Sequence, residues 1–237
     1  MVSLSASRTQ AIEMRIPILL SINGGYVDTT SFLALHGLFA AHVTGNFVTL
    51  GAALVLGTSG AVAKLLALPM FCAVIVAAHL LSFPLRRNGI AVLRTMLLLK
   101  LILLLVAAVL AVRLGPFADG DSMSALLTGM TLVAAMAIQN AAHRIHLPHA
   151  PPSTLMTGTT TQIMIDVADL LHGENPGDRA VARTRMGRMT ASVAAFAFGC
   201  GAAALAFAFL REWSFFVPTV FALLAYLFAP RADSPAG

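Results

Sequence analysis

The stretch HVTGNFVTL at residues 42–50 has a near copy, LMTGTTTQI, at residues 155–163. In each copy a Thr-Gly pair and a further polar residue open a short apolar run, and the two pairs lie 113 residues apart. Threonine can cap a helix N-terminus through its hydroxyl, and glycine permits the close approach of a ligand or another helix. The repetition therefore predicts two helix starts at equivalent places of a duplicated fold.

The composition is that of a membrane protein. The chain has 237 residues, of which 58% are hydrophobic and 11% are charged, and its mean hydropathy is +0.86. Soluble domains are about half apolar and about a quarter charged, whereas a helix needs about 20 apolar residues to cross a bilayer. The sequence predicts an all-α polytopic membrane protein with six transmembrane helices, at residues 16–38, 62–85, 95–112, 123–142, 189–210 and 213–229.

The basic residues fall between these apolar stretches, and the net charge is +5. Lysine and arginine in short loops mark the cytoplasmic side of a membrane protein, so we expect topology signals and no nucleic-acid partner. With six spans, every rich cluster is cytoplasmic if both termini are. Residues 1–15 then form a cytoplasmic N-terminal segment and residues 230–237 a cytoplasmic tail. The clusters are Arg8 and Arg15; Arg86, Arg87 and Arg94; and Arg179, Arg183, Arg185 and Arg188.

The two Thr-Gly segments are too short to cross the membrane. As helices, residues 44–56 and 157–171 would be about 20 and about 22 Å long, against a hydrocarbon core of about 30 Å. If both crossed, Arg86 and Arg87 would lie outside, against the charge rule. We therefore expect two re-entrant half-helices, meaning short helices that begin inside the membrane and leave by the side from which the chain entered.

The chain then divides into two units of the same form, residues 16–113 and residues 123–229. Asp28 precedes Thr44 by 16 residues, and Asn140 precedes Thr157 by 17. Each unit crosses the membrane three times, so the second must be inverted relative to the first. Inverted repeats with interrupted apolar segments at matching positions predict a transport site near the bilayer midplane.

A half-helix that begins inside the membrane points unpaired N–H groups and the positive end of its dipole into the protein. The two half-helices are candidate halves of one site for an anion or a polar neutral solute; the alternative is two capped ends with packing glycines. Asp28 lies near mid-membrane, as a proton carrier, a cation ligand, or a protonated or capped side chain bonded to Asn23 or to the half-helix. The candidate substrate-binding residues are Asp28, Thr44, Gly45, Asn46, Gln139, Asn140, Thr157, Gly158 and Thr159.

Other polar residues suit structural roles. Lys100 follows Arg94 and is expected to extend toward the cytoplasmic interface. Asp166 and Asp169 are expected to be solvated or paired with the arginines after Asp178. A disulfide is not expected, because Cys72 and Cys200 each lie within an apolar span. We also expect no metal site and no other cofactor, because prolines at 148, 151 and 152 end the helix that carries the three histidines His143, His146 and His149.

The segments GGYVDTTSFLALHGLFAAHVTGNFVTLGAAL (24–54), AMAIQNAAH (135–143) and LMTGTTTQIMIDVADLL (155–171) support a family resemblance. The chain resembles the YoaK-like family of bacterial integral membrane proteins of unknown function. The resemblance rests on the Asp28, Thr-Gly-Asn, Gln-Asn and second Thr-Gly positions, and it covers most of the chain. It implies a multi-span inner-membrane protein and no particular activity.

The sequence favours a transporter or channel for a small polar, anionic solute, with the proton as a candidate coupling ion. The lipid bilayer is the other expected partner, and the oligomeric state is left open. No enzyme is expected, since the chain has no P-loop, no nucleophile elbow and no soluble catalytic domain. The alternatives are a structural or accessory membrane protein and a small intramembrane enzyme that acts on a lipid or a quinone.

Overall fold

The computed structural model describes residues 2–172 and 176–231, with side chains for residues 15–172 and 179–231. Within these residues every regular element is a helix, so the all-α prediction is confirmed. The elements, in chain order, are α1 (Val2–Ala34), the 3₁₀ turn η1 (Val43–Gly45), α2 (Asn46–Leu56), α3 (Ala61–Arg87), α4 (Val92–Leu114), α5 (Met123–His146), α6 (Met156–His172), α7 (Pro176–Leu210), the 3₁₀ segment η2 (Arg211–Phe216) and α8 (Val217–Phe228).

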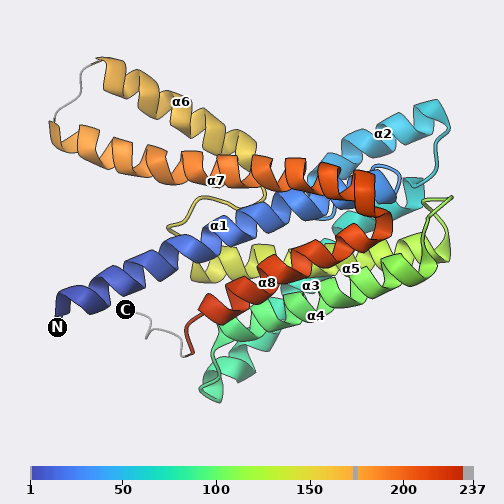
Figure 1. Cartoon of the computed structure of the whole chain (residues 1–237), viewed down its shortest axis with the longest axis horizontal. Coiled ribbons are helices and arrows are strands. Elements are labelled where there is room, and N and C mark those ends of the chain that lie inside the picture. Colours follow the sequence, from blue (N-terminus) through green and yellow to red (C-terminus); the bar gives the residue numbers. More distant parts are fainter. Residues whose placement is uncertain (1, 173–175, 232–237) are drawn as a thin grey trace.

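The long helices lie roughly along one axis, and the chain reverses direction between its ends (Figure 1). At one end, the Asp121 carboxylate before α5 accepts hydrogen bonds from four backbone N–H groups at the start of α3, those of residues 60 to 63. At the other end, the Arg15 guanidinium on α1 lies 5.5 Å from the Phe228 ring, and the Arg94 guanidinium on α4 lies 4.7 Å from the Tyr226 ring. The beginning of α1 and the end of α8 therefore share one end of the bundle.

Four helical stretches are long and apolar enough to cross a membrane: Ala61–Arg87, Val92–Leu114, Met123–His146 and Arg179–Phe228. The protein is therefore a multi-pass membrane protein by helix length and composition. The fourth stretch contains the expected span at 189–210 and all but the last residue of the one at 213–229. In Figure 1 the chain turns back between α7 and α8, at η2.

Helix α1 differs from the expected first span at both ends. It begins at Val2, so the segment expected before the first span continues the helix, and it ends at Ala34, where residues 16–38 were expected to cross. It is absent from the four apolar stretches because Asn23, Asp28 and their polar neighbours lower its hydropathy. The expected cytoplasmic tail at 230–237 falls mostly on residues 232–237, outside the described part of the chain.

Helix α1 lies inside the bundle, packed against α5, α7 and α8. Its contact with α7 is unusually close at two glycines. A Cβ added at Gly25 would overlap the carbonyl oxygen of Phe196, and one added at Gly199 would overlap the carbonyl oxygen of Ile22. Small residues that let helix backbones approach closely are typical of membrane helix pairs. Gly199 thus lies at a close helix contact, whereas Gly201 faces open space.

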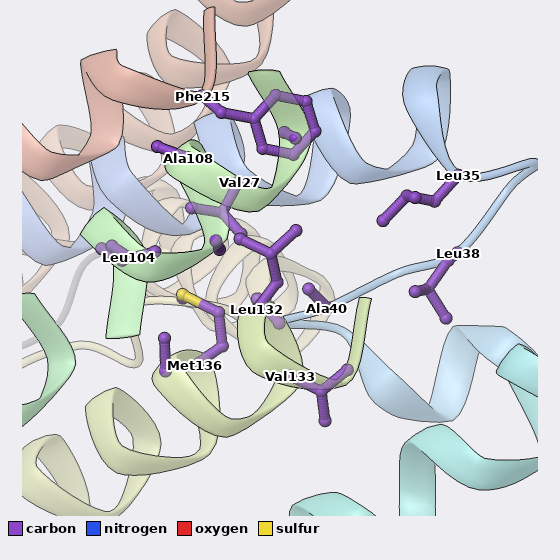
Figure 2. Close-up of a cluster of buried hydrophobic side chains, with 14 of the residues drawn as sticks. Val27, Leu35, Leu38, Ala40, Leu104, Ala108, Leu132, Val133, Met136 and Phe215 are labelled. Carbon is purple, nitrogen blue, oxygen red and sulfur yellow. The ribbon is translucent and has the colours of Figure 1, made fainter. Parts of the chain in front are cut away.

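The largest apolar core joins α1, α4, α5 and the segment that follows α1 (Figure 2). Leu38 and Ala40 belong to that segment, which has no helical structure, and both are fully buried against residues such as Val27 and Met136. Apolar side chains on the outer faces, by contrast, are exposed, as expected where lipid takes the place of protein. The core therefore holds an irregular stretch of chain within the helix bundle.

Two substitutions on α7 test the close contact with α1. Gly199→Ala places a methyl group against the Ile22 backbone carbonyl, so we expect overpacking to lower stability by about 1–3 kcal/mol. Gly201→Ala is the matched control, since its methyl group meets nothing within 4 Å. The measurement is thermal unfolding of the purified protein in detergent. Equal midpoints for the two variants would contradict the close packing.

Candidate functional site

The first break in the helical structure follows α1. The chain turns at His36 and Gly37, whose φ angles of 54° and 84° are left-handed, and returns into the bundle as residues 38–42. The Asp28 carboxylate, 4% exposed, accepts hydrogen bonds from the backbone N–H groups of Ala41 at 2.6 Å and His42 at 3.1 Å. Asp28 thus satisfies backbone groups that lipid cannot.

Asn46, at the start of α2, holds the same returning segment. Its side chain accepts a hydrogen bond from the Phe39 N–H at 2.9 Å and donates one to the Phe39 carbonyl at 2.8 Å. Asn46 is 1% exposed, so this pair of bonds is shielded from competing water. Two predicted site residues, Asp28 and Asn46, therefore meet at the first break, both as partners of the backbone.

The second break follows α5 and repeats this arrangement. The Gln139 amide donates hydrogen bonds to the Leu20 carbonyl at 2.9 Å and to Ser153 Oγ at 3.1 Å. Asn140 Oδ1 accepts a hydrogen bond from the Thr154 hydroxyl at 2.7 Å. Each of these residues bonds 14 positions ahead, and Asp28 bonds 13 and 14 positions ahead. Asp28 and Asn140 thus bond at similar distances ahead in the chain, Asp28 to backbone N–H groups and Asn140 to a side-chain hydroxyl.

The Thr-Gly pairs themselves lie differently from the prediction. Thr44 is exposed and is not the cap of α2, whose N-cap is Gly45 with no side-chain capping bond. The cap prediction for Thr44 is wrong because Asp28 and Asn46 hold the returning chain instead. Gly45 packs near the Phe39 ring, whereas Gly158 is exposed, with nothing within 4 Å of an added Cβ.

The start of α6 is largely open. Thr157 is exposed and lines an open hollow of about 710 Å³ along one face of this helix, together with apolar residues such as Met164 and Ile165. Thr159 is buried, and its hydroxyl donates to the Leu155 carbonyl at 3.3 Å. The described contacts thus do not join Thr157 or Gly158 to Asp28 or Asn46.

Lys100 is a candidate site residue that the sequence reasoning did not include. It was expected to extend to the interface, but it is fully buried, and its ammonium donates to Gln139 Oε1 at 2.5 Å. It is buried because it lies between Met96 and Leu104 at spacings of four, on the face of α4 that packs against α5. The available signal was the charge itself, because an ionisable residue in a transmembrane helix is a functional candidate by default.

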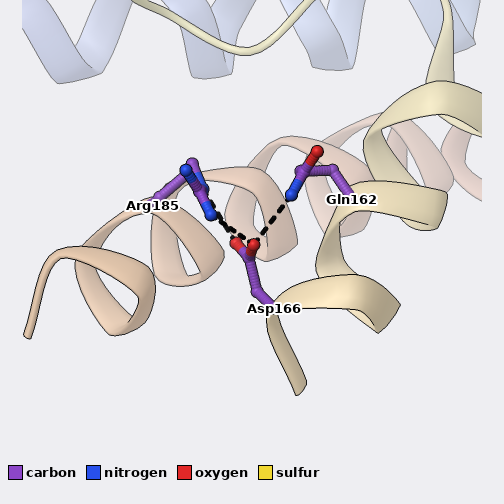
Figure 3. Close-up of polar contacts among 3 residues, drawn as sticks. All are labelled: Gln162, Asp166 and Arg185. Atoms are coloured by element: carbon purple, nitrogen blue, oxygen red, sulfur yellow. Dashed lines mark hydrogen bonds and ion pairs between the residues drawn. The ribbon is translucent and has the colours of Figure 1, made fainter. Parts of the chain in front are cut away.

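Asp166 belongs to a separate ion pair in the second half of α6 (Figure 3). Arg185 on α7 donates through two nitrogens to its carboxylate, at 2.9 and 2.5 Å, and the Gln162 amide donates at 2.8 Å. The pairing expected with an arginine after residue 178 is confirmed for Asp166. Hydrogen bonding from Arg185 holds the pKa of Asp166 below its ordinary value. This group fastens α6 to α7.

Among the described residues, no group of three or more His, Cys, Asp or Glu side chains is placed to hold a metal ion. Cys72 and Cys200 are both free thiols. The polar groups brought together at the two breaks are therefore a carboxylate, an ammonium and several amides and hydroxyls. They can form hydrogen bonds and pair with a charged solute.

The chain belongs to the family described as "Protein of unknown function (DUF1275)", whose match covers residues 16–228. The match includes both helix breaks and all of the candidate site residues. No curated protein and no solved structure matches the chain.

Substitutions at Asp28 test its role in holding the first break. Asp28→Ala leaves the N–H groups of Ala41 and His42 without their acceptor, and a buried unsatisfied donor costs about 1–3 kcal/mol. Asp28→Asn keeps an oxygen acceptor, so it should lose less stability than the alanine variant. Thermal unfolding in detergent compares them. An alanine variant as stable as the wild type would show that the carboxylate does not hold the break.

Proposed function

We propose that this protein is a membrane transporter or channel for a small polar, anionic solute. The solute binds near the bilayer midplane, between the two helix breaks. The observation that carries the proposal is Lys100, a fully buried lysine whose side-chain nitrogen bonds to a neutral amide beside the second break.

The proposal includes six spans arranged as two inverted repeats. The two repeats would be α1 to α4 and α5 to α8. When each helix is replaced by its counterpart in the other repeat, three helix contacts correspond to three other contacts that are also present. The packing of α1 with α7 becomes that of α5 with α3, and the packing of α4 with α5 becomes that of α8 with α1. The packing of α6 with α7 becomes that of α2 with α3. These matched pairs, with the equivalent bonds of Asp28 and Asn140, support a common ancestral unit.

The two short helices are proposed to be re-entrant. Helix α2 has 11 residues and α6 has 17, or about 17 and about 26 Å at 1.5 Å per residue, less than a hydrocarbon core of about 30 Å. In Figure 1 they extend from the middle of the molecule toward its opposite ends. Interrupted helices whose N-terminal ends lie at the midplane are the usual setting for substrate sites in repeat transporters.

Lys100 supports an anionic solute. Among residues 15–172 and 179–231 the only ion pair is that of Asp166 with Arg185, so no carboxylate pairs with Lys100. Gln139 connects it to Ser153, two residues before the exposed chain at the start of α6. A buried ammonium has a large desolvation cost, which an anion beside it would offset. The N–H groups at the start of α6 provide further donors.

A structural or accessory protein is the second candidate, and a specific observation favours it. Asp28, Asn46, Gln139 and Asn140 all bond to groups of the protein itself, as residues that only hold a helix bundle would. An intramembrane enzyme is the third candidate and has no corresponding observation. The YoaK-like group remains a hypothesis within the family.

Anion-dependent stabilisation of the purified protein tests the transport site. A ligand that binds only the folded protein raises stability by about 2.7 kcal/mol at one hundred times its dissociation constant. We expect at least one anion from a panel of chloride, nitrate, sulfate, phosphate and small carboxylates to raise the unfolding midpoint, and Lys100→Met to abolish the shift.

The matched control is Lys64→Met, because Lys64 is the only other lysine in the chain and lies at the start of α3, near Asp121. Its variant should keep the anion response. If no anion stabilises the wild type, the structural candidate is favoured. If an anion raises the unfolding midpoint of Lys100→Met as much as that of Lys64→Met, Lys100 is not the anion-binding group.

Single cysteines in a background without Cys72 and Cys200 test the topology. Thr58→Cys and Ala118→Cys should react with an impermeant thiol reagent in intact cells, because both exposed residues lie at the end proposed to face outward. Arg87→Cys and Arg183→Cys should react only after permeabilisation. Labelling of either arginine position from outside would contradict six spans with cytoplasmic termini.

A further inference from the structure

We propose that the hollow beside Asp28 binds a small organic cation, of the alkylammonium class. This site is separate from the proposed anion site at Lys100, and its occupation does not depend on whether the protein transports a solute.

The hollow has a volume of about 330 Å³ and lies between α1, the returning segment after it, and α7. This volume suits a small organic molecule, since ligand pockets are commonly about 300–1,000 Å³. Its lining combines one carboxylate with aromatic, apolar and small polar side chains: Asp28, Thr29, Phe32, Leu33, Phe39, His42, Phe196 and Cys200.

The carboxylate at the hollow has no cationic partner within the described residues. The bonds to Asp28 come from the backbone N–H groups of Ala41 and His42, and the described ion pair lies elsewhere, between Asp166 and Arg185. N–H dipoles stabilise a carboxylate but leave its net charge in place. Charged side chains inside membrane proteins almost always pair with another group. The hollow would allow a cation from outside the protein to reach Asp28.

The aromatic side chains decide which cation fits. The rings of Phe32 and Phe39 lie with centroids 5.1 Å apart, and those of Phe39 and His42 lie 5.9 Å apart. Phe196 joins them from α7. Aromatic faces attract cations, and quaternary ammonium groups are commonly recognised by several rings together. A metal ion such as Ca²⁺ or Mg²⁺ would need about six oxygen ligands, which this mostly apolar lining does not provide.

Choline chloride is the probe, and 3,3-dimethyl-1-butanol is its uncharged analogue of the same shape. Equimolar sodium chloride controls for ionic strength and for the anion. Each is titrated into the purified wild-type protein, and binding is followed by the thermal unfolding midpoint and by calorimetry. We expect choline to bind and to raise the midpoint, and neither the alcohol nor sodium chloride to do so.

Two variants identify the groups that bind choline. Asp28→Asn should weaken binding at least tenfold, because it removes the charge, and Phe39→Leu should weaken it about threefold to thirtyfold, because it removes one aromatic face. Phe83→Leu is the matched control, since Phe83 is an exposed phenylalanine on α3 outside the hollow. Its variant should bind like the wild type.

Equal binding of choline and the alcohol would overturn the proposal, as would unchanged choline binding in Phe39→Leu. If Asp28→Asn does not fold, the comparison of Phe39→Leu with Phe83→Leu still tests whether choline binds in the hollow. A protein that binds choline but responds to no anion would support this inference while contradicting the proposed anion site, so the two can fail independently.

Discussion

Backbone N–H and C=O groups inside a membrane have no water to bond, and every one of them needs a partner from the protein. A continuous helix meets this requirement by itself, but a chain that leaves its helix does not. We propose that the two helix breaks, after α1 and after α5, lie within the membrane, where polar side chains supply the missing partners. The Asp28 carboxylate is the strongest of these acceptors, because charge-assisted hydrogen bonds are roughly twice as strong as neutral ones.

Meeting this requirement shapes the rest of the bundle. The partners can act only if the returning segments are buried, so apolar residues such as Leu38 and Ala40 lie in the main core. A polar α1 must in turn be enclosed by other helices, and Gly25 and Gly199 let α7 approach it closely. The polar side chains at the breaks and the close contact between α1 and α7 therefore both keep polar groups away from lipid. Loss of either would expose polar backbone to lipid.

The two breaks differ in charge. The first contains the Asp28 carboxylate, and the second contains Gln139 and Asn140 with the Lys100 ammonium beside them. This difference in charge is the physical basis for the two proposals, an anion near Lys100 and an organic cation near Asp28. In both places the charged group also bonds to the protein itself. A ligand would add to these bonds without having to replace them.

Much of the architecture was determined by the sequence alone, because helix length and hydropathy are local properties. The apolar stretches, the two short helices and the matching positions of Asp28 and Asn140 are all visible in the order of residues. Only the tertiary structure decided which face each helix presents and what lies against it. It buried Lys100 on the α5 side of α4, bonded Asp28 to the N–H groups of Ala41 and His42, and left Gly158 open. It also gathered Phe32, Phe39 and Phe196 around one carboxylate. These outcomes depend on contacts between segments far apart in the chain, such as those that contain Phe32 and Phe196, and no local pattern of residues contains that information.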